Sequence, residues 1–319
     1  MTRATAGGKA SRHLFGPVPS RRLGRSLGID LVPHKVCPLD CVYCECGETT
    51  DKTFERREWV PTNEVLTELT DWIAMGGRAD HLTFSGAGEP TLHLHLGEIA
   101  RFAADHTAIP LALITNATLF VDPRVRAEVS PCQVILPSLD AADEESFARI
   151  NRPLPGLTAA TLVEGLVALR REYSGAIWLE ILLIEGFNDS DRALAALAQA
   201  VERIAPDRVQ LNTAVRPGTV SEIEPAGREL LERAQAWLGP RAEPVANFKA
   251  APASAAGDSD SLEERLMAII SRRPENPTAL AAALDLNQGL CDRALERLVR
   301  AGRATITERG GKPYVTRAK

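Results

Sequence analysis

The sequence predicts an α/β protein: a partial, TIM-like (β/α)6 barrel followed by a small C-terminal winged-helix domain. Short apolar runs rich in β-branched residues alternate with amphipathic helical patterns between about residues 28 and 240, which indicates βαβ units around a parallel sheet. Six such units are visible, fewer than the eight of a closed barrel. A polar segment then separates three further helical patterns and a hairpin pattern from the rest.

Strands are expected where apolar and β-branched residues run together and end in a small or polar residue. The expected strands are 28–33, 81–86, 111–115, 133–140, 176–184 and 207–213. In barrels the chemistry gathers at the carboxyl ends of the strands, where they run into their loops. We therefore look for functional residues at these junctions.

Helices are expected after these strands, where apolar residues recur at helical spacing. In the first, over 62–75, Val65, Leu69 and Trp72 share one face behind a cap at Thr62. The other helices are expected near 94–106, 158–173, 190–204 and 225–238. Regular alternation of the two element types favours a parallel sheet.

A composition break marks the end of the barrel. Residues 247–261 are small, polar and rich in Pro, Gly and Ser, which is typical of a linker. Three helical patterns and two strands around Gly310 and Gly311 follow, which is a winged-helix order and leaves nucleic acid and protein open as partners. The predicted domains are a basic N-terminal segment over 1–27, the barrel over 28–246, the linker over 247–261 and the winged-helix-like domain over 262–319.

Charge and composition restrict the class of function. The 319 residues carry a net charge of −5, so the chain is not a uniformly basic nucleic-acid binder. Its ends are basic, with six Lys/Arg and no Asp/Glu in 1–25, and eleven Lys/Arg against seven Asp/Glu in 262–319. This asymmetry is a weak indication of a polyanionic partner. No secretory or membrane-spanning segment is visible, and we expect a cytoplasmic protein without membrane contact.

Cys37, Cys41 and Cys44 form the most informative pattern, with three and two residues between them, directly after the first expected strand. A loop of this kind can bring three thiolates around one side of a cubane iron–sulfur cluster and leave the fourth iron open. A zinc site with Cys46 as a fourth thiolate is the alternative. Zinc sites usually pair two separate cysteine knuckles, and no second knuckle follows here.

A Gly-rich turn with a carboxylate, SGAGEPTLH, ends the second expected strand. Gly86 and Gly88 permit close approach of the backbone to a ligand. Backbone carbonyls and Glu89 can surround an ammonium group with acceptors. A tight strand-to-helix turn with a solvated glutamate is the plain alternative.

Polar residues also end the next strands. Thr115 and Asn116 end the third, and Ser138 and Asp140 end the fourth, where they can hydrogen-bond a ribose or a carboxylate or cap the following helix. Glu180 lies inside the apolar run of the fifth strand. A buried carboxylate needs a partner, which is either an arginine or a ribose diol.

Five arginines are candidates for contact with an anionic substrate. Arg21, Arg22 and Arg25 precede the first expected strand, near the entrance of the barrel, and Arg152 and Arg216 lie on later loops. Guanidinium groups bind carboxylates and phosphates through paired donors. A basic tail and surface salt bridges are the alternatives.

The cysteine loop, with Tyr43 before its last cysteine, resembles the signature loop of the radical S-adenosylmethionine (SAM) superfamily. SGAGEPTLH resembles its GGE-type motif, with Ala87 in the middle position. The resemblance implies a 4Fe-4S cluster on the three cysteines, SAM chelating the fourth iron, and reductive cleavage of SAM to methionine and a 5′-deoxyadenosyl radical. The residues then expected at the cofactor are Tyr43, Gly86, Gly88, Glu89, Thr115, Asn116, Ser138, Asp140 and Glu180.

Within the superfamily, four segments resemble wyosine-base synthases and their uncharacterised bacterial relatives, over residues 16–31, 85–93, 138–153 and 211–218. Those synthases carry a second cluster on cysteines N-terminal to the radical loop, whereas residues 1–36 contain none. Condensation of pyruvate onto tRNA is therefore not expected. The substrate is unidentified, with tRNA or another nucleic acid as one candidate, and an external electron donor such as flavodoxin or ferredoxin is implied.

Two other functions use the same features. A redox or oxygen sensor would couple an iron–sulfur cluster to DNA binding by the winged helix. An activase would install a radical on a partner protein docked by that domain. The Gly86-to-Glu89 turn is unnecessary for a sensor, which favours the enzyme.

Overall fold

The computed structural model describes most of the chain. The described residues are 12–20, 22–220, 222–245, 262–284 and 286–318. Arg21, the predicted linker over 247–261 and the first eleven residues lie outside them. Among the described residues, no helix is both long enough and apolar enough to cross a bilayer.

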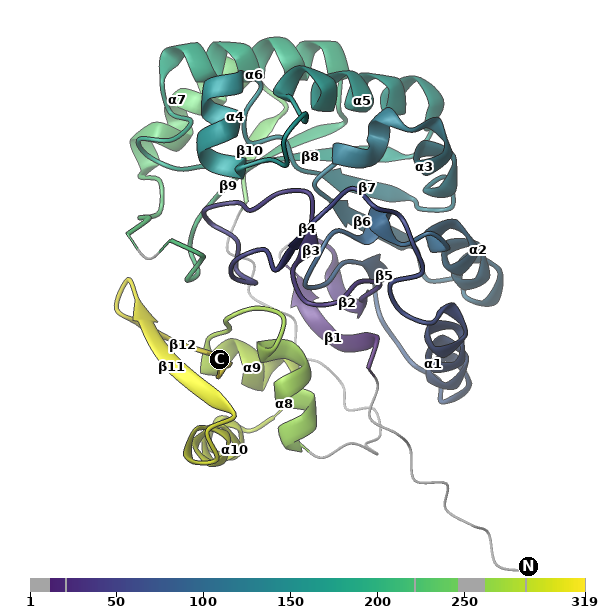
Figure 1. Cartoon of the computed structure of the whole chain (residues 1–319). Helices are drawn as coiled ribbons and strands as arrows, with labels where there is room; N and C mark the ends of the chain where they lie inside the picture. The colour runs from purple at the N-terminus through teal and green to yellow at the C-terminus, as the bar shows by residue number, and fades with distance from the viewer. Residues whose placement is uncertain (1–11, 21, 221, 246–261, 285, 319) are drawn as a thin grey trace, which may run out of the picture.

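A curved eight-stranded sheet forms the centre of the molecule (Figure 1). Its order is β1-β2-β5-β6-β7-β8-β9-β10, and every neighbouring pair from β2 onward is parallel. The strands are β1 (Leu14–Ser20), β2 (Gly24–Ile29), β5 (His81–Phe84), β6 (Leu111–Thr115), β7 (Val134–Pro137), β8 (Ala176–Leu183), β9 (Arg208–Thr213) and β10 (Ala242–Pro244). The mostly parallel α/β sheet confirms the expected class and is consistent with a partial barrel.

The two edges of the sheet differ from the sequence prediction. β1, within the predicted basic segment, pairs antiparallel with β2 at one edge, and β10 adds a short parallel strand at the other. β1 contains Pro17 and Pro19, which an edge strand tolerates because one side needs no ladder donors. β2 begins at Gly24, before the predicted residue 28. Pairing with two neighbours therefore overrides the weak strand propensity of its first residues.

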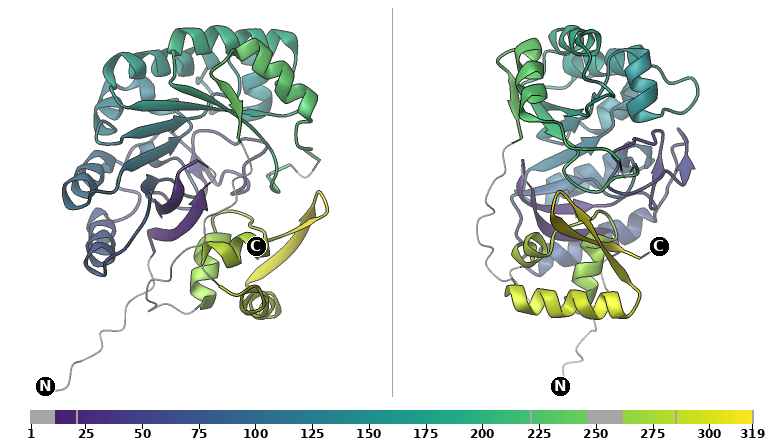
Figure 2. Two further views of the ribbon diagram at one scale, coloured as in Figure 1. Left: turned by 180° about the vertical axis from the view of Figure 1, so that it is seen from behind. Right: turned by 90° about the vertical axis from the view of Figure 1, so that its left-hand side faces the viewer.

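Helices cover the outer face of this sheet (Figure 2). They are α1 (Thr62–Ala74), α2 (Leu96–His106), α3 (Pro123–Glu128), α4 (Glu144–Asn151), α5 (Ala159–Glu172), α6 (Asp191–Ile204) and α7 (Arg228–Leu238). Short elements between them are β3 (Val36–Cys37), β4 (Asp51–Lys52), η1 (Pro90–Leu92) and η2 (Thr118–Val121). Side chains of Asp143, Thr158 and Ser190 cap α4, α5 and α6 by accepting backbone N–H bonds. α3 and α4 are too short to show helical periodicity, which is why the sequence does not predict them.

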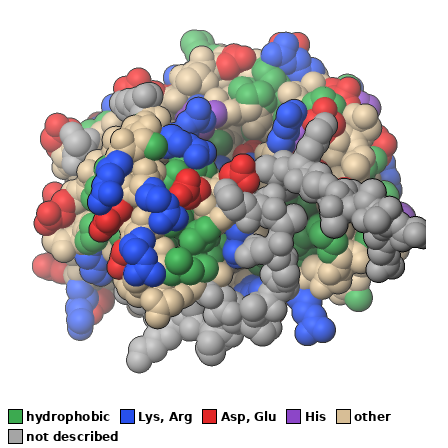
Figure 3. All heavy atoms as spheres, turned by 90° about the horizontal axis from the view of Figure 1, so that it is seen from below, with side chains coloured by type: hydrophobic (Ala, Val, Ile, Leu, Met, Phe, Trp, Pro, Cys, Tyr) green, Lys and Arg blue, Asp and Glu red, His purple; other side chains and the backbone are tan. Residues whose placement is uncertain are grey.

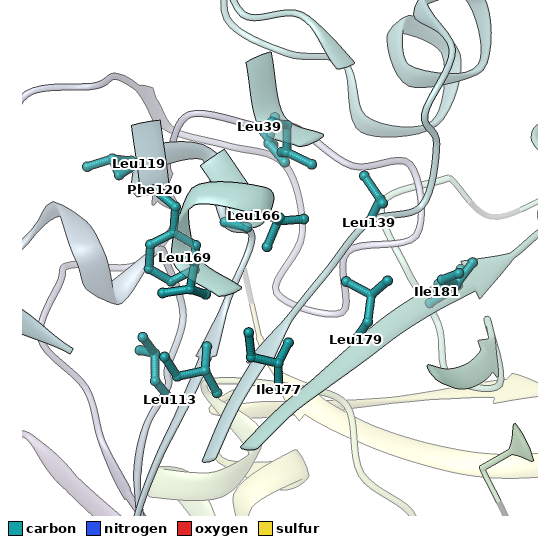
Figure 4. Packing of buried hydrophobic residues seen from close by; sticks show 14 of the residues in the cluster. Leu39, Leu113, Leu119, Phe120, Leu139, Leu166, Leu169, Ile177, Leu179 and Ile181 are labelled. Atoms are coloured by element: carbon teal, nitrogen blue, oxygen red, sulfur yellow. The ribbon is translucent and has the colours of Figure 1, made fainter. Parts of the chain in front are cut away.

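The main core lies between the sheet and these helices (Figure 4). On β8, Ile177, Leu179 and Ile181 alternate toward this side and are fully buried. Leu166 of α5 is also fully buried in this cluster, and its truncation to alanine would cost about 2–5 kcal/mol. A smaller cluster on the concave face contains Leu23, Ala112, Val134 and Leu136. Leu23, between β1 and β2, therefore packs onto the concave face of the barrel.

A separate C-terminal module follows, defined here as residues 262–318. Its elements are α8 (Leu262–Ile270), α9 (Pro277–Ala283), α10 (Gln288–Arg300), β11 (Ala304–Arg309) and β12 (Lys312–Arg317). β11 and β12 form an antiparallel hairpin whose turn residues Gly310 and Gly311 both have positive φ, 55° and 69°, a conformation that favours glycine. Three helices and a hairpin are the predicted order.

The module packs against β1 of the barrel. Val18 of β1 belongs to the core of the module, with Leu266, Leu280 and Leu295. In Figures 1 and 2 the module lies beneath the sheet, and its hairpin reaches toward the loop after β9. It therefore contacts segments at both sides of the open barrel.

Candidate functional site

The cysteine loop lies at the carboxyl end of β2 and is fixed to α4. Backbone N–H groups of Asp40 and Val42 donate to the carbonyls of Asn151 and Ile150, each at 3.0 Å. Val42 is fully buried, so it holds the middle of the loop in the core. The three cysteines are half-buried and carry free thiols.

Asp140 connects this loop to the sheet. Its Oδ2 accepts the Tyr43 hydroxyl at 2.5 Å and the Asn151 amide at 2.7 Å, and its Oδ1 accepts the Leu182 N–H at 3.0 Å. Burial raises the pKa of Asp140, and the bonds from Tyr43 and Asn151 oppose that rise. Tyr43 and Asp140 thus anchor the loop to the ends of β7 and β8. Their predicted contact with the cofactor stays a prediction.

Glu89 has a comparable position between β5 and β6. Its Oε1 accepts the Thr91 N–H and hydroxyl at 3.1 and 2.6 Å and the Thr115 hydroxyl at 2.7 Å, while Oε2 accepts the Asn116 N–H at 2.8 Å. Burial raises the pKa of Glu89, and these bonds oppose the rise. The side chain is 2% exposed, so the alternative of a solvated glutamate is wrong.

The two glycines of the turn bring its backbone against the cysteine loop. A Cβ on Gly86 would lie 2.0 Å from Asp30 Oδ1, and one on Gly88 would lie 2.5 Å from the Val36 carbonyl oxygen. The Ala87 carbonyl accepts the Lys35 N–H at 2.7 Å, and the Glu89 N–H donates to Val36 at 3.0 Å. The Gly-rich turn and the cysteine loop therefore form one packed unit.

A cavity opens beside Cys41 at the carboxyl ends of the strands. Four residues predicted at the cofactor contribute to its wall: Tyr43, Asn116, Ser138 and Asp140. The remaining lining residues are Leu39, Cys41, Leu139, Ala141, Phe147, Asn151 and Leu162. Asn151 was not predicted. Its Oδ1 is buried and without a hydrogen-bond partner among the described residues.

The sulfurs each have a hydrogen-bond donor. Lys35 Nζ is 3.0 Å from Cys44 Sγ, Asn116 Nδ2 is 3.3 Å from Cys37 Sγ, and Asn151 Nδ2 is 3.4 Å from Cys41 Sγ. Burial raises the pKa of the Cys37 thiol to about 12 and that of Cys41 further. The neighbouring Cys46 and the ammonium of Lys35 lower the pKa of the Cys44 thiol to about 6, against the effect of burial.

This donor set fits an anionic iron–sulfur cluster. Lys35 is only 3% exposed, and a buried ammonium needs negative charge beside it. Burial lowers the pKa of Lys35, but Cys44 and Cys37 raise it overall. Among the described residues no three His, Cys, Asp or Glu side chains are placed for a single metal ion. In a cluster each cysteine binds a different iron, so the sulfurs stay farther apart than the ligands of one zinc.

Glu180 is paired with Arg22. The two side chains, 15% and 17% exposed, form an ion pair across the concave face. Of the two partners the sequence allowed for Glu180, the structure provides the arginine. The charge of Arg22 is therefore balanced within the chain, and its predicted substrate contact stays a prediction.

The other arginines do not gather into one anion site. Arg216 lies between Glu45 and Glu275, at 3.2 Å from each, and is 17% exposed. This is a buried ionic group and not a surface salt bridge, and the predicted substrate contact of Arg216 stays a prediction. Burial lowers the pKa of Arg216, but Glu45 and Glu275 raise it overall. Arg25 lies at the amino end of β2, away from the cysteine loop at its carboxyl end, because the strand begins earlier than predicted. Arg152 is exposed, 3.9 Å from Asp40.

The C-terminal module contacts the site directly. Arg272 Nε donates to Asp30 Oδ2 at 2.8 Å beside the Gly86 turn, and Cys46 Sγ donates to the Arg272 carbonyl at 2.8 Å. On the other side, the Tyr314 hydroxyl donates to Val215 at 3.2 Å and Arg309 donates to the carbonyls of the 216–223 loop. The module therefore joins the β1 edge of the barrel to the loop after β9. The sequence analysis did not predict this contact, and its only signal was Asp30, an acid within an apolar run directly after β2.

The profile of the radical SAM superfamily matches residues 31–198, which include the three cysteines of the loop. The chain belongs to the radical SAM superfamily. It is therefore an enzyme of the radical SAM type, a superfamily whose cofactors are a 4Fe-4S cluster and SAM.

Several known proteins are similar to this chain over most of its length. A UPF0026 protein of Methanocaldococcus jannaschii is 30% identical over 311 residues, 94% of each chain. A protein of Brachyspira hyodysenteriae named GTPase Obg is 30% identical over 294 residues, and the match covers 92% of this chain but 43% of that protein. Among solved structures, a radical SAM methyltransferase from Sphaerobacter thermophilus has a TM-score of 0.50 at 18% identity, covering 69% and 66% of the two chains. That likeness shows the fold alone.

Proposed function

We propose that this protein cleaves SAM reductively at a 4Fe-4S cluster held by Cys37, Cys41 and Cys44 and directs the resulting radical at an unidentified substrate. The cavity beside Cys41, lined by strand-end polar residues, carries this proposal. When bound, the cluster supplies the electron that breaks a carbon–sulfur bond of SAM and releases methionine and a 5′-deoxyadenosyl radical.

The residues of the chain divide into those that face the cavity and those that support its wall. Ser138, in the wall of the cavity, is placed to hydrogen-bond a hydroxyl or amino group of SAM. Glu89 Oε2 accepts one hydrogen bond and keeps capacity for an ammonium. Thr115 and Asp140 act through Glu89 and the cysteine loop, to which their side chains are bonded. A water-poor site of this kind protects a reactive radical.

The segments that resemble wyosine-base synthases build this site. Residues 16–31 form most of the β1–β2 hairpin and end at Leu31 beside the cysteine loop, and residues 138–153 contain α4 and both Asp140 and Asn151. We place the protein in that group as a relative with one cluster, since no cysteine stands in residues 1–36. The shared segments therefore define the cofactor site and not the substrate.

The C-terminal module is proposed to be winged-helix-like and to close the open side of the barrel. Its hairpin is engaged with the loop after β9 through Arg309 and Tyr314. Figure 3 shows basic and acidic side chains interspersed on the described part of this face. An RNA substrate would therefore approach through the exposed helices of the module and not through its hairpin. We also propose that the chain divides into a barrel, a linker and this module. We further propose a cytoplasmic location and a flavodoxin or ferredoxin as electron donor.

The test is cleavage of SAM by the full chain. Protein reconstituted anaerobically with iron and sulfide is given dithionite and SAM, and 5′-deoxyadenosine is measured by mass spectrometry. Cys41→Ala should abolish its formation. Cys132→Ala is the matched control, because this buried cysteine lies outside the loop and should leave product formation unchanged. Zinc in place of iron, or intact SAM with the wild type, would contradict the proposal.

A further inference from the structure

Each sulfur of the cysteine loop receives a nitrogen donor from a different part of the chain. Asn116 follows the carboxyl end of β6, Asn151 is the last residue of α4, and Lys35 precedes β3. Their distances to the sulfurs of Cys37, Cys41 and Cys44 are 3.3, 3.4 and 3.0 Å. Packing alone does not require that each of the three sulfurs has its own nitrogen donor.

The orientation of both amides is fixed by their other partners. Asn116 Oδ1 accepts the Thr118 N–H at 3.0 Å and the Thr118 hydroxyl at 2.7 Å, so Nδ2 must face Cys37. Asn151 Nδ2 is bonded to the Asp140 carboxylate, which only accepts, so its second N–H is available for Cys41. The ammonium of Lys35 has donors only. All three groups therefore present N–H to sulfur.

The backbone holds Lys35 at some conformational cost. Its φ is 57°, a left-handed conformation that costs a residue with a side chain roughly 1–2 kcal/mol. The Lys35 N–H donates to Ala87 at 2.7 Å, and its carbonyl accepts the Thr50 N–H at 3.0 Å. These bonds keep the ammonium in its buried position beside Cys44.

We propose that Asn116, Asn151 and Lys35 are positioning residues that raise the reduction potential of the cluster. The inference rests on the proposed function, because it requires a 4Fe-4S cluster on the three cysteines. One-electron reduction adds negative charge that is shared by the cysteine sulfurs. N–H donors and a nearby cation stabilise the reduced form more than the oxidised form, so they move the potential upward.

A raised reduction potential affects how readily the cluster receives its electron. A higher potential makes the cluster easier to reduce by an external one-electron donor. Because the three donors come from β6, α4 and the segment before β3, the fold sets this property before SAM or substrate binds. Asn116, expected at the cofactor, thus acts on a cluster ligand.

The experiment is a dithionite titration of the reconstituted full chain, followed by electron paramagnetic resonance. Asn116→Leu removes the donor at similar size. At the ambient potential where the wild type is half reduced, the ratio of reduced to oxidised cluster should fall about tenfold, a shift of about 59 mV for one electron. Asn116→Asp should shift it further, since it adds a negative charge beside Cys37. Ile114→Val, two residues away on the concave face, is the matched control and should not shift it.

Lys35→Met is a second, independent variant. It should lower the reduction potential of the cluster, as Asn116→Leu should. A lowered potential with unchanged iron and sulfide content supports the inference. An unchanged potential in fully loaded Asn116→Leu and Lys35→Met overturns it, and so does loss of the cluster in every donor variant, which would indicate structural support only. If the wild type itself holds no iron–sulfur cluster, the proposed function fails and not this inference alone.

Discussion

The cysteine site and the seam between the barrel and the C-terminal module are both buried and polar, but they are built differently. At the site, Asp140 and Glu89 each accept several hydrogen bonds from neutral donors on nearby strand ends. At the seam, charged partners come from distant parts of the chain, as in Arg272 with Asp30 and Arg216 with Glu275. The first arrangement fixes one loop geometry, whereas the second joins two units with separate cores.

The comparison predicts that the two regions fail independently. A change at the site should remove the cluster, and a change at the seam should loosen the module while the cluster remains. The variants below are ordered from the largest expected effect to the smallest.

Asp140→Ala should have the largest effect. It leaves the Tyr43 hydroxyl, the Asn151 amide and the Leu182 N–H without their acceptor, and each unsatisfied buried group costs about 1–3 kcal/mol. We expect cluster content to fall at least severalfold, measured as iron and sulfide per chain. Asp140→Asn keeps one acceptor and should lose less. Full loading of Asp140→Ala would refute the anchoring role of this carboxylate.

Arg216→Met should destabilise the seam. It removes the cation between Glu45 and Glu275, but Glu275 keeps Arg273 at 3.1 Å, so the cost should lie below the roughly 3–5 kcal/mol of a buried pair that loses its only partner. We expect faster proteolysis within the module and an earlier urea transition, with iron content close to that of the wild type. Arg216→Lys keeps the charge, so its urea transition should lie between those of the wild type and Arg216→Met. Loss of the cluster as large as in Asp140→Ala would erase the contrast between the two regions.

The pair of Arg272 and Asp30 tests whether the seam reaches the site. A double-mutant cycle with Arg272→Met and Asp30→Asn should show a coupling free energy of about 0.5–3 kcal/mol in urea unfolding, because the two groups are in contact. Since Asp30 lies against the Gly86 turn, both single variants should also weaken SAM binding modestly, measured by equilibrium dialysis. Strict additivity would show that the contact contributes nothing to docking.

Gly311→Ala should have the smallest effect. The residue has a φ of 69° in the hairpin turn, and alanine there costs about 1 kcal/mol. We expect a lower melting temperature of the module and unchanged iron content. A shift in cluster content after this change would show that the module supports the cluster loop as a whole.

The sequence predicts strands best where a short apolar run ends in a loop that carries functional residues. The triplet Cys37, Cys41 and Cys44 and the Gly86-to-Glu89 turn are local patterns, so their positions at strand ends followed directly. β1 was missed because its prolines and glycine hide an edge strand that forms by pairing with β2. The acids that pair with Arg22 and Arg216 could not be predicted, because they come from distant segments of the chain. Asn151 and Lys35 gave no separate signal, since a sulfur contact depends on tertiary placement.

The central claim is that three cysteines hold a 4Fe-4S cluster with one open iron facing the cavity beside Cys41. Its most direct test is electron paramagnetic resonance of the reduced, reconstituted protein before and after addition of SAM. The account predicts a signal of a reduced cluster whose line shape changes when SAM binds the open iron. A signal that SAM leaves unchanged, or no iron–sulfur signal in protein with a full set of cysteines, would contradict it.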